Sequence, residues 1–169
     1  MNLQSHLRQT LVTTREFSER LLQAFHTPEE WTFQVHPQSN HALWFAGHIG
    51  NTDNFFVSVL APDQSAPRTG FREKFGPGSQ PTNRPEDYPA AEEVLSYLRE
   101  RRGVLLSLLD SMDDARLETR TPKGSPEFIP DFASVFRAAG WHEGVHAGQL
   151  TVVRRALGHP PLMNGPPPG

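Results

Sequence analysis

Four segments of the chain place apolar residues three and four positions apart, the spacing that puts them on one face of an α-helix. These segments span residues 3–25, 41–60, 89–112 and 131–157. No segment shows the sustained apolar–polar alternation that is typical of a half-buried strand. Four amphipathic helices bury their apolar faces most simply against one another. The sequence therefore predicts an all-α fold, a four-helix bundle that forms a single domain over residues 1–169.

Local signals mark where some of these helices begin. Thr27 and Glu30 flank a Pro and a Glu in the pattern of a capping box, which predicts a short helical turn there. Asp131 precedes the fourth apolar segment and is a suitable N-cap residue. Ser39 or Asn40 is in the same position before the second segment.

The connection between the second and third helices, residues 61–88, is rich in Pro and Gly and much longer than most helix–helix loops. The two helices that it joins therefore need not be adjacent and antiparallel. Long loops in compact domains are often functional, but a solvated crossover with Phe71 and Phe75 packed onto the bundle fits equally well. Residues 159–169 are rich in Pro and are expected to form an extended tail.

Composition excludes several classes of function. The 16 Lys and Arg residues nearly balance the 19 Asp and Glu residues, so no basic surface for nucleic acid is expected. The first residues lack the features of a signal peptide, and no segment approaches the ~20 apolar residues of a membrane span. We expect a cytoplasmic protein with neither membrane nor nucleic acid as a partner. The chain has no Cys, so thiolate metal sites and a cysteine nucleophile are excluded.

Three histidines replace apolar residues on the predicted buried faces. His142 and His146 are four positions apart on the fourth helix, and His48 is on the second. A single histidine in such a position is usually a hydrogen-bonded core residue, but three buried imidazoles need several polar partners. One shared divalent ion would satisfy all three, and we interpret them as metal ligands. The other histidines are interpreted as surface residues: His6, His26, His36, His41 and His159.

His142, Glu143 and His146 also form the H-E-x-x-H pattern of zinc peptidases. Those enzymes take their third ligand downstream, from a later Glu or from a His six residues on. No Asp or Glu follows Glu143 in this chain, and position 152 is Val. The third ligand must therefore come from upstream, and His48 is the best-placed candidate. The peptidase interpretation fails on this spacing.

The stretch H-E-x-x-H-x-G-Q-L, followed by R-R-A-L-G-H-P-P, resembles the last helix of the DinB-like superfamily. The earlier N-H-A-L-W-F-A-G-H-I-G-N resembles its second helix, whose final His is a ligand, and F-x-x-K-F-G-P-G-S-Q-P resembles its long loop. The resemblance implies a four-helix bundle, often dimeric, with a three-His site for Zn, Ni, Fe or Mn. Characterised members include transferases and isomerases that use bacillithiol or mycothiol. The family name implies no DNA binding.

Two residues near the predicted ligands have alternative roles. Glu143 follows His142 and can serve as a general base for a metal-bound water, or it can pair with Arg101 or Arg102. Gln149 follows His146 by one turn and can orient its second ring nitrogen or form a helix–helix hydrogen bond. The sequence offers no obvious fourth metal ligand, which favours an open catalytic site over a closed structural one.

Other residues around the site are interpreted with less specific evidence. Trp44 and Trp141 flank ligand positions and are candidate walls of a pocket. Gly140, Gly144 and Gly148 repeat every four residues, which suggests a close approach of another backbone, within the fold or across a dimer.

The leading functional hypothesis is a metal-dependent enzyme that uses a low-molecular-weight thiol, as an S-transferase or in a hydrolytic reaction on a small-molecule substrate. Four loop cations, Arg68, Arg72, Lys74 and Arg84, can receive an acidic cofactor or simply be solvated. The alternative is a non-enzymatic, metal-stabilised stress-response dimer. Both hypotheses include a homodimer, and three imidazoles accept several divalent metals.

Overall fold

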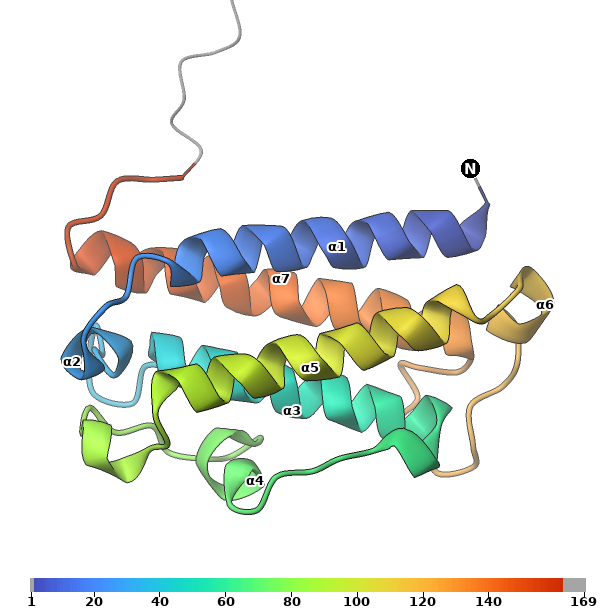
Figure 1. The fold of residues 1–169 in the computed structure, drawn as a ribbon, viewed down its shortest axis with the longest axis horizontal. Coiled ribbons are helices and arrows are strands. Elements are labelled where there is room, and N and C mark those ends of the chain that lie inside the picture. The colour runs from blue at the N-terminus through green and yellow to red at the C-terminus, as the bar shows by residue number, and fades with distance from the viewer. Residues whose placement is uncertain (1, 163–169) are drawn as a thin grey trace, which may run out of the picture.

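The computed structural model describes residues 2–162 and contains helices but no strand within them. Four long helices form the bundle (Figure 1): α1 (Leu3–Leu22), α3 (Ala42–Leu60), α5 (Ala91–Asp110) and α7 (Phe132–Ala156). The predicted all-α four-helix bundle is confirmed. Residues 163–169 of the predicted Pro-rich tail lie outside the described part of the chain. Within that part, no helix has a run long and apolar enough to cross a bilayer.

Short helices occupy the connections. They are α2 (Pro28–Trp31), η1 (Pro62–Gln64), α4 (Phe71–Phe75), η2 (Pro85–Asp87) and α6 (Asp114–Leu117). Thr27 caps α2 in the predicted capping box, with its side chain accepting from the Glu30 amide and the Glu30 carboxylate accepting in return. Asp131 caps α7 as expected and accepts from the backbone amide of Ser134.

The N-cap of α3 is His41, not Ser39 or Asn40. Its Nδ1 accepts a hydrogen bond from the backbone amide of Trp44 at 3.1 Å. The imidazole also packs edge-on against the ring of Tyr88, with 4.9 Å between ring centroids. His41 is only 1% exposed, so the interpretation as a surface residue is wrong. Its capping role and its aromatic neighbour account for the burial.

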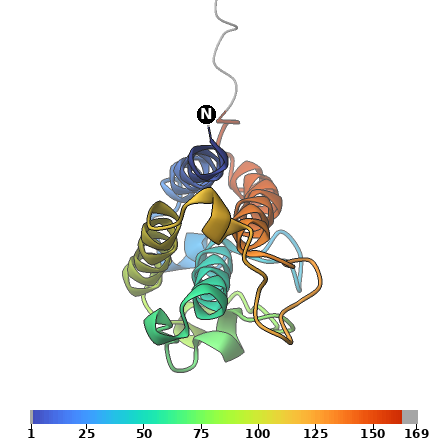
Figure 2. The ribbon, with the colours of Figure 1, turned by 90° about the vertical axis from the view of Figure 1, so that its right-hand side faces the viewer.

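The long helices surround the core in the order α1, α7, α3, α5, as the end-on view shows (Figure 2). The colour sequence in Figure 1 shows that α1 and α7 run in one direction and α3 and α5 in the other. The two helices joined by the long connection are therefore adjacent and parallel. A parallel pair requires a connection that returns along the bundle, which explains the length of this crossover.

Two aromatic residues hold the crossover against the bundle. Phe71 and Phe75, at the ends of α4, are both buried, as the packed-crossover interpretation expected. The ring of Phe75 lies directly against the backbone of α3 at Gly47, where a Cβ atom would overlap the ring. Gly47 is therefore required for this close contact.

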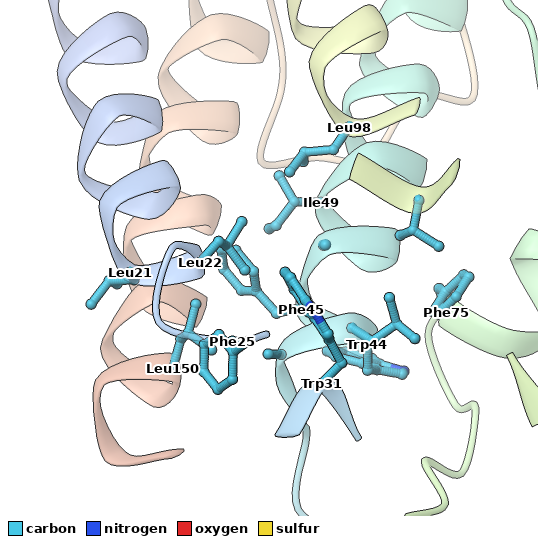
Figure 3. Close-up of a cluster of buried hydrophobic side chains, with 14 of the residues drawn as sticks. Leu21, Leu22, Phe25, Trp31, Trp44, Phe45, Ile49, Phe75, Leu98 and Leu150 are labelled. Atoms are coloured by element: carbon cyan, nitrogen blue, oxygen red, sulfur yellow. The ribbon is translucent and has the colours of Figure 1, made fainter. Parts of the chain in front are cut away.

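Buried apolar side chains form two clusters, one toward each end of the bundle. The α2-end cluster is shown in Figure 3 and includes Leu21, Leu22, Phe25, Trp31, Trp44, Phe45, Ile49, Phe75, Leu98 and Leu150. The α6-end cluster includes Leu7, Leu11, Phe56, Val57, Leu105, Leu109, Leu117, Ile129, Val135, Phe136 and Ala139.

A layer of four buried charged residues lies between these clusters. Each long helix contributes one residue to it: Arg15, Asp53, Arg102 and Glu143. Glu143 binds the Nε of Arg15 and the Nη2 of Arg102, each at 2.7 Å. Asp53 binds the same two guanidinium groups, at 3.1 and 2.9 Å. We call these residues the charged layer. Its two positive and two negative charges balance inside the core, as buried charges require.

Candidate metal centre

His48 of α3 comes together with His142 and His146 of α7, where the two helices pack side by side. One ring nitrogen from each histidine lies within 4.8 Å of the other two. The Nε2 atoms of His48 and His142 are 3.1 Å apart. The predicted convergence of three imidazoles from distant parts of the chain is therefore confirmed, and the cluster can hold a metal ion.

The buried face of α7 is rotated relative to the sequence-based expectation. His142 and His146 were expected to continue the apolar stripe into the core, but both are only partly buried. The fully buried positions beside them are Glu143 and Ala147. The charged layer accounts for this rotation, because Glu143 must face the bundle centre to reach its two arginines. The cluster consequently lies at the edge of the α3–α7 interface, where a small molecule can approach it.

A backbone carbonyl of the crossover orients His48. The Nδ1 of His48 is 2.8 Å from the carbonyl oxygen of Phe75. A carbonyl can only accept, so Nδ1 must carry the proton. The Nε2 lone pair of His48 therefore points toward the other two imidazoles, which is the arrangement of a metal-binding histidine.

Gln149 orients His146 in the same way. The Nδ1 of His146 is 2.9 Å from Gln149 Oε1, and the same oxygen accepts from Asn40 Nδ2 at 3.2 Å. Gln149 thus combines both roles considered from the sequence, since it orients His146 and joins α7 to the start of α3. The proton on Nδ1 again leaves the Nε2 lone pair available.

The distance between His48 and His142 fits a shared ion. With the His48 proton on Nδ1, two Nε2 atoms at 3.1 Å need either a proton or a cation between them. Two nitrogens bound to one tetrahedral zinc at about 2.1 Å are about 3.4 Å apart. The three imidazoles therefore fit a first-row divalent metal in both donor type and spacing.

Burial keeps these imidazoles neutral. It lowers the pKa of His48 from 6.5 to about 4, although the bond to Phe75 opposes the shift. Burial and the neighbouring imidazoles also lower the pKa of His142 to about 4. The pKa of His146 is lowered by burial, with Gln149 opposing. The neutral form, which binds metals, is therefore the one present at neutral pH.

The two tryptophans near the ligands occupy different environments. Trp44 is buried and stacks on His48, with 4.3 Å between ring centroids and 12° between planes. Its Nε1 donates to the hydroxyl of Ser79 at 2.7 Å, so the crossover holds Trp44 as well as His48. Trp141 is 70% exposed and lines a pocket beside the cluster.

Glu143 takes the ion-paired role that was the alternative to a general base. It is 0% exposed, and each of its carboxylate oxygens has a guanidinium partner in Arg15 or Arg102. Burial alone would raise the pKa of Glu143, but the two arginines outweigh it and hold the pKa below its usual value. Glu143 does not line the pocket beside the cluster. We therefore assign it a structural role rather than proton transfer.

A pocket of about 580 Å³ opens beside His48 and His142, between α3, α7 and the crossover. Its wall is mainly apolar and includes Phe55, Phe56, Pro67, Pro77, Phe128, Ala138 and Trp141. This volume is within the range of pockets that bind small molecules. The cluster therefore adjoins a space that a substrate can enter.

The crossover cations have separate partners. Arg68 pairs with Glu93 and Glu100, and Arg84 pairs with Asp87 at 2.8 Å. Lys74 donates to the backbone carbonyl of Asp87. Arg72 differs, because it lines the pocket and makes no ion pair within residues 2–162. Arg72 is exposed, so the solvated interpretation fits it, but it also lines the pocket and can meet a bound ligand.

Only one of the three repeated glycines of α7 is closely approached within the fold. A Cβ atom at Gly140 would lie 3.2 Å from the methyl carbon of Thr10 on α1. Gly144 and Gly148 have open space around them. Within residues 2–162, Gly140 is thus approached by side chains of α1 and not by another backbone, so the predicted backbone contact is not found there.

Several contributors to the site were missed in the sequence. Arg15 and Asp53 each lie among the buried apolar positions of their helices, and a charged residue within an apolar stripe was the available signal. Phe128 lies in the connection before α7 and gave no periodic signal. The Phe75 carbonyl is a backbone group, so no residue type could reveal its role.

A protein-family model described as the DinB superfamily matches residues 7–150. A solved structure described as a conserved protein from Enterococcus faecalis is similar to this chain, with 21% identity and a TM-score of 0.71. The similarity covers 94% of this chain and 99% of that one, and at this identity it shows the fold alone. No curated protein matches the chain.

Proposed function

The chain belongs to the DinB superfamily, and on that premise we propose that it is a metal-dependent enzyme that acts through a low-molecular-weight thiol. The observation that carries the proposal is the three-His cluster at the edge of an apolar pocket. His48, His142 and His146 are the proposed ligands of a divalent metal such as Zn, Ni, Fe or Mn. The reaction class that we favour is S-transfer to a small-molecule substrate, with hydrolysis as the related possibility.

A divalent metal in this cluster would lower the pKa of a bound thiol or water. The chain has no Cys, so the sulfur must come from a small molecule. The protein's own contribution is orientation and exclusion of water. The Phe75 carbonyl and Gln149 orient two of the imidazoles, while Trp44 covers the face of His48.

The alternative is a non-enzymatic stress-response dimer in which the metal only joins α3 to α7. A structural site of this kind is normally closed by a fourth protein ligand. Within residues 2–162, no other His, Asp or Glu joins the three histidines. The open side of the cluster and the adjoining pocket therefore favour the enzyme.

Elemental analysis of protein purified without a His tag tests the metal site. Wild type and the control variant His6→Ala, which changes an exposed histidine far from the cluster, should contain a divalent metal. His48→Ala and His146→Ala should lose most of it. Equal metal content in all four proteins would remove the proposed site.

A conjugation assay then separates the enzyme from the alternative. Metal-loaded wild type and the His6→Ala variant should accelerate the reaction of bacillithiol or mycothiol with a small electrophile, and the His48→Ala variant should not. Full metal content without any acceleration across several thiols and electrophiles would favour the non-enzymatic dimer.

A further inference from the structure

We infer that the pocket beside the cluster binds an aromatic or otherwise apolar small molecule with one anionic group, which pairs with Arg72. This inference deepens the proposed function by naming the class of the small-molecule substrate. It depends on three observations: the wall of the pocket, the polar side chains within it, and the charge at Arg72.

The wall offers a large apolar surface that residues 2–162 leave uncovered. Phe55, Phe128 and Trp141 are 42%, 63% and 70% exposed, and all three line this pocket. They come from α3, from the connection before α7 and from α7 itself. Aromatic side chains gathered in one hollow are typical of a ligand pocket, and they favour a flat apolar ligand.

The polar side chains of the pocket are mostly engaged within the protein. The hydroxyl groups of Thr52 and Ser58 donate to carbonyls of their own helix. Asn54 donates to Ser65 and accepts from the amide of Ala66. Asn51 donates to the Phe71 carbonyl. Few of these groups remain to bind the hydroxyls of a sugar-like thiol, so the pocket suits the apolar reaction partner better than the thiol.

Arg72 is the one Arg or Lys in this lining among the residues that the structure describes. It is exposed and has no carboxylate partner within the part of the chain that the structure describes, whereas Arg68 and Arg84 nearby are both ion-paired. A guanidinium binds a carboxylate through two parallel hydrogen bonds. A single carboxylate or similar anion on the ligand therefore complements the pocket.

Calorimetric titration of chelator-treated protein tests the inference, because a carboxylate cannot then bind a metal instead of Arg72. The probes are 2-naphthoate and its neutral isostere 2-naphthamide. Wild type should bind 2-naphthoate about tenfold more tightly than 2-naphthamide, the value of one charge-assisted contact. Arg72→Met should remove this preference. Lys74→Met, which removes a charge from the same helix outside the pocket, should retain it.

Phe128→Ala should weaken the binding of both probes to a similar degree, since it removes part of the aromatic wall without changing the charge of the pocket. The inference is overturned if neither probe binds, or if Arg72→Met leaves the preference for 2-naphthoate intact. Affinity that falls as protein concentration rises would also overturn it, because a second copy of the chain would then occupy the pocket. Metal content measured on the same preparations before chelator treatment keeps the outcomes separate: absence of naphthoate binding by protein that was purified with its metal rejects this inference but not the metal site.

Discussion

At the scale of single residues, the site depends on hydrogen bonds that hold a proton on Nδ1 of His48 and of His146, so that each Nε2 faces the cluster. Gln149 accepts the proton of His146 Nδ1, so its loss should let the imidazole turn or change tautomer. We predict that Gln149→Leu lowers metal affinity about tenfold, a typical effect for the partner of a metal-binding histidine. Competition with a chelator of known affinity measures the change.

The matched control is Gln149→Glu, which keeps an oxygen acceptor at the same place. It should retain affinity close to wild type. An equal loss in both variants would show that the oxygen acceptor at position 149, which is shared by His146 and Asn40, does not account for the effect.

The lowered histidine pKa values predict how metal-free protein responds to acid. His48 and His142 have a pKa of about 4 in the folded chain and 6.5 when unperturbed. Between these values the unfolded chain binds protons that the folded chain does not, so acid favours unfolding. The free energy of unfolding should therefore be highest above pH 6.5 and fall as the pH drops toward about 4.

Urea denaturation of chelator-treated protein across this pH range measures the effect. His41 contributes in the same direction, because burial also lowers its pKa to about 4. The variant His48→Gln should lose less stability over the range than wild type, while His6→Ala should behave as wild type does. A free energy of unfolding that does not change between pH 6.5 and 4 would contradict the prediction.

The ligand residues could be predicted from the sequence because side-chain chemistry and helical spacing both indicate them. His142 and His146 share a face by spacing alone, and His48 interrupts an apolar stripe. The burial of His142 and His146 was predicted wrongly, because hydropathy ranks their neighbour Glu143 as a surface residue. Only its pairing with Arg15 and Arg102, which are far away in sequence, makes burial of that carboxylate favourable.

At the scale of elements, the crossover is part of the site rather than a simple connection. Its Phe75 carbonyl orients His48, its Ser79 holds Trp44, and its α4 packs on α3. The sequence indicated that this segment was unusually long, but it could not show which backbone group would face a ligand. Such contacts depend on tertiary packing, which leaves no periodic pattern.

The contact at Gly47 provides a test of this coupling. We predict that Gly47→Ala displaces the ring of Phe75 and moves its carbonyl away from His48. Overpacking of this kind should cost about 1–3 kcal/mol of stability, and metal affinity should fall with it. Thermal denaturation and chelator competition measure the two effects.

Gly103→Ala is the matched control, because Gly103 is in α5 with open space around it. Removing a helical glycine there should stabilise the protein by about 0.5–1 kcal/mol and leave metal affinity unchanged. If Gly47→Ala also stabilised the protein, the close packing of Phe75 on α3 would be refuted.

At the scale of the whole molecule, the charged layer joins all four long helices at one level. Because each carboxylate binds two arginines, the layer fixes the rotation of α7 and so the direction of its histidines. We predict that Glu143→Gln costs about 3 kcal/mol of stability, since it leaves two buried arginines with one carboxylate. Metal affinity should fall as well, because His142 adjoins the altered residue.

An exposed ion pair serves as the control for the stability loss expected in Glu143→Gln. Glu19 pairs with Arg99 at 2.8 Å on the surface between α1 and α5, and Glu19→Gln should cost less than about 1 kcal/mol. Similar losses in Glu143→Gln and Glu19→Gln, measured by urea denaturation, would show that the charged layer contributes no more than a surface pair.

The outer face of α7 is the part of the molecule best suited to the expected homodimer. Val145 and Val152 are exposed there, and Gly144 and Gly148 beside them leave open space into which a second helix can pack. We predict a dimer in solution that Gly144→Leu weakens, because the new side chain would fill this space. Sedimentation equilibrium measures the mass, and Gly103→Leu, at an exposed position of α5, should leave the dimer intact. A monomeric wild type would exclude the dimer, and a Gly144→Leu variant as dimeric as wild type would exclude this face.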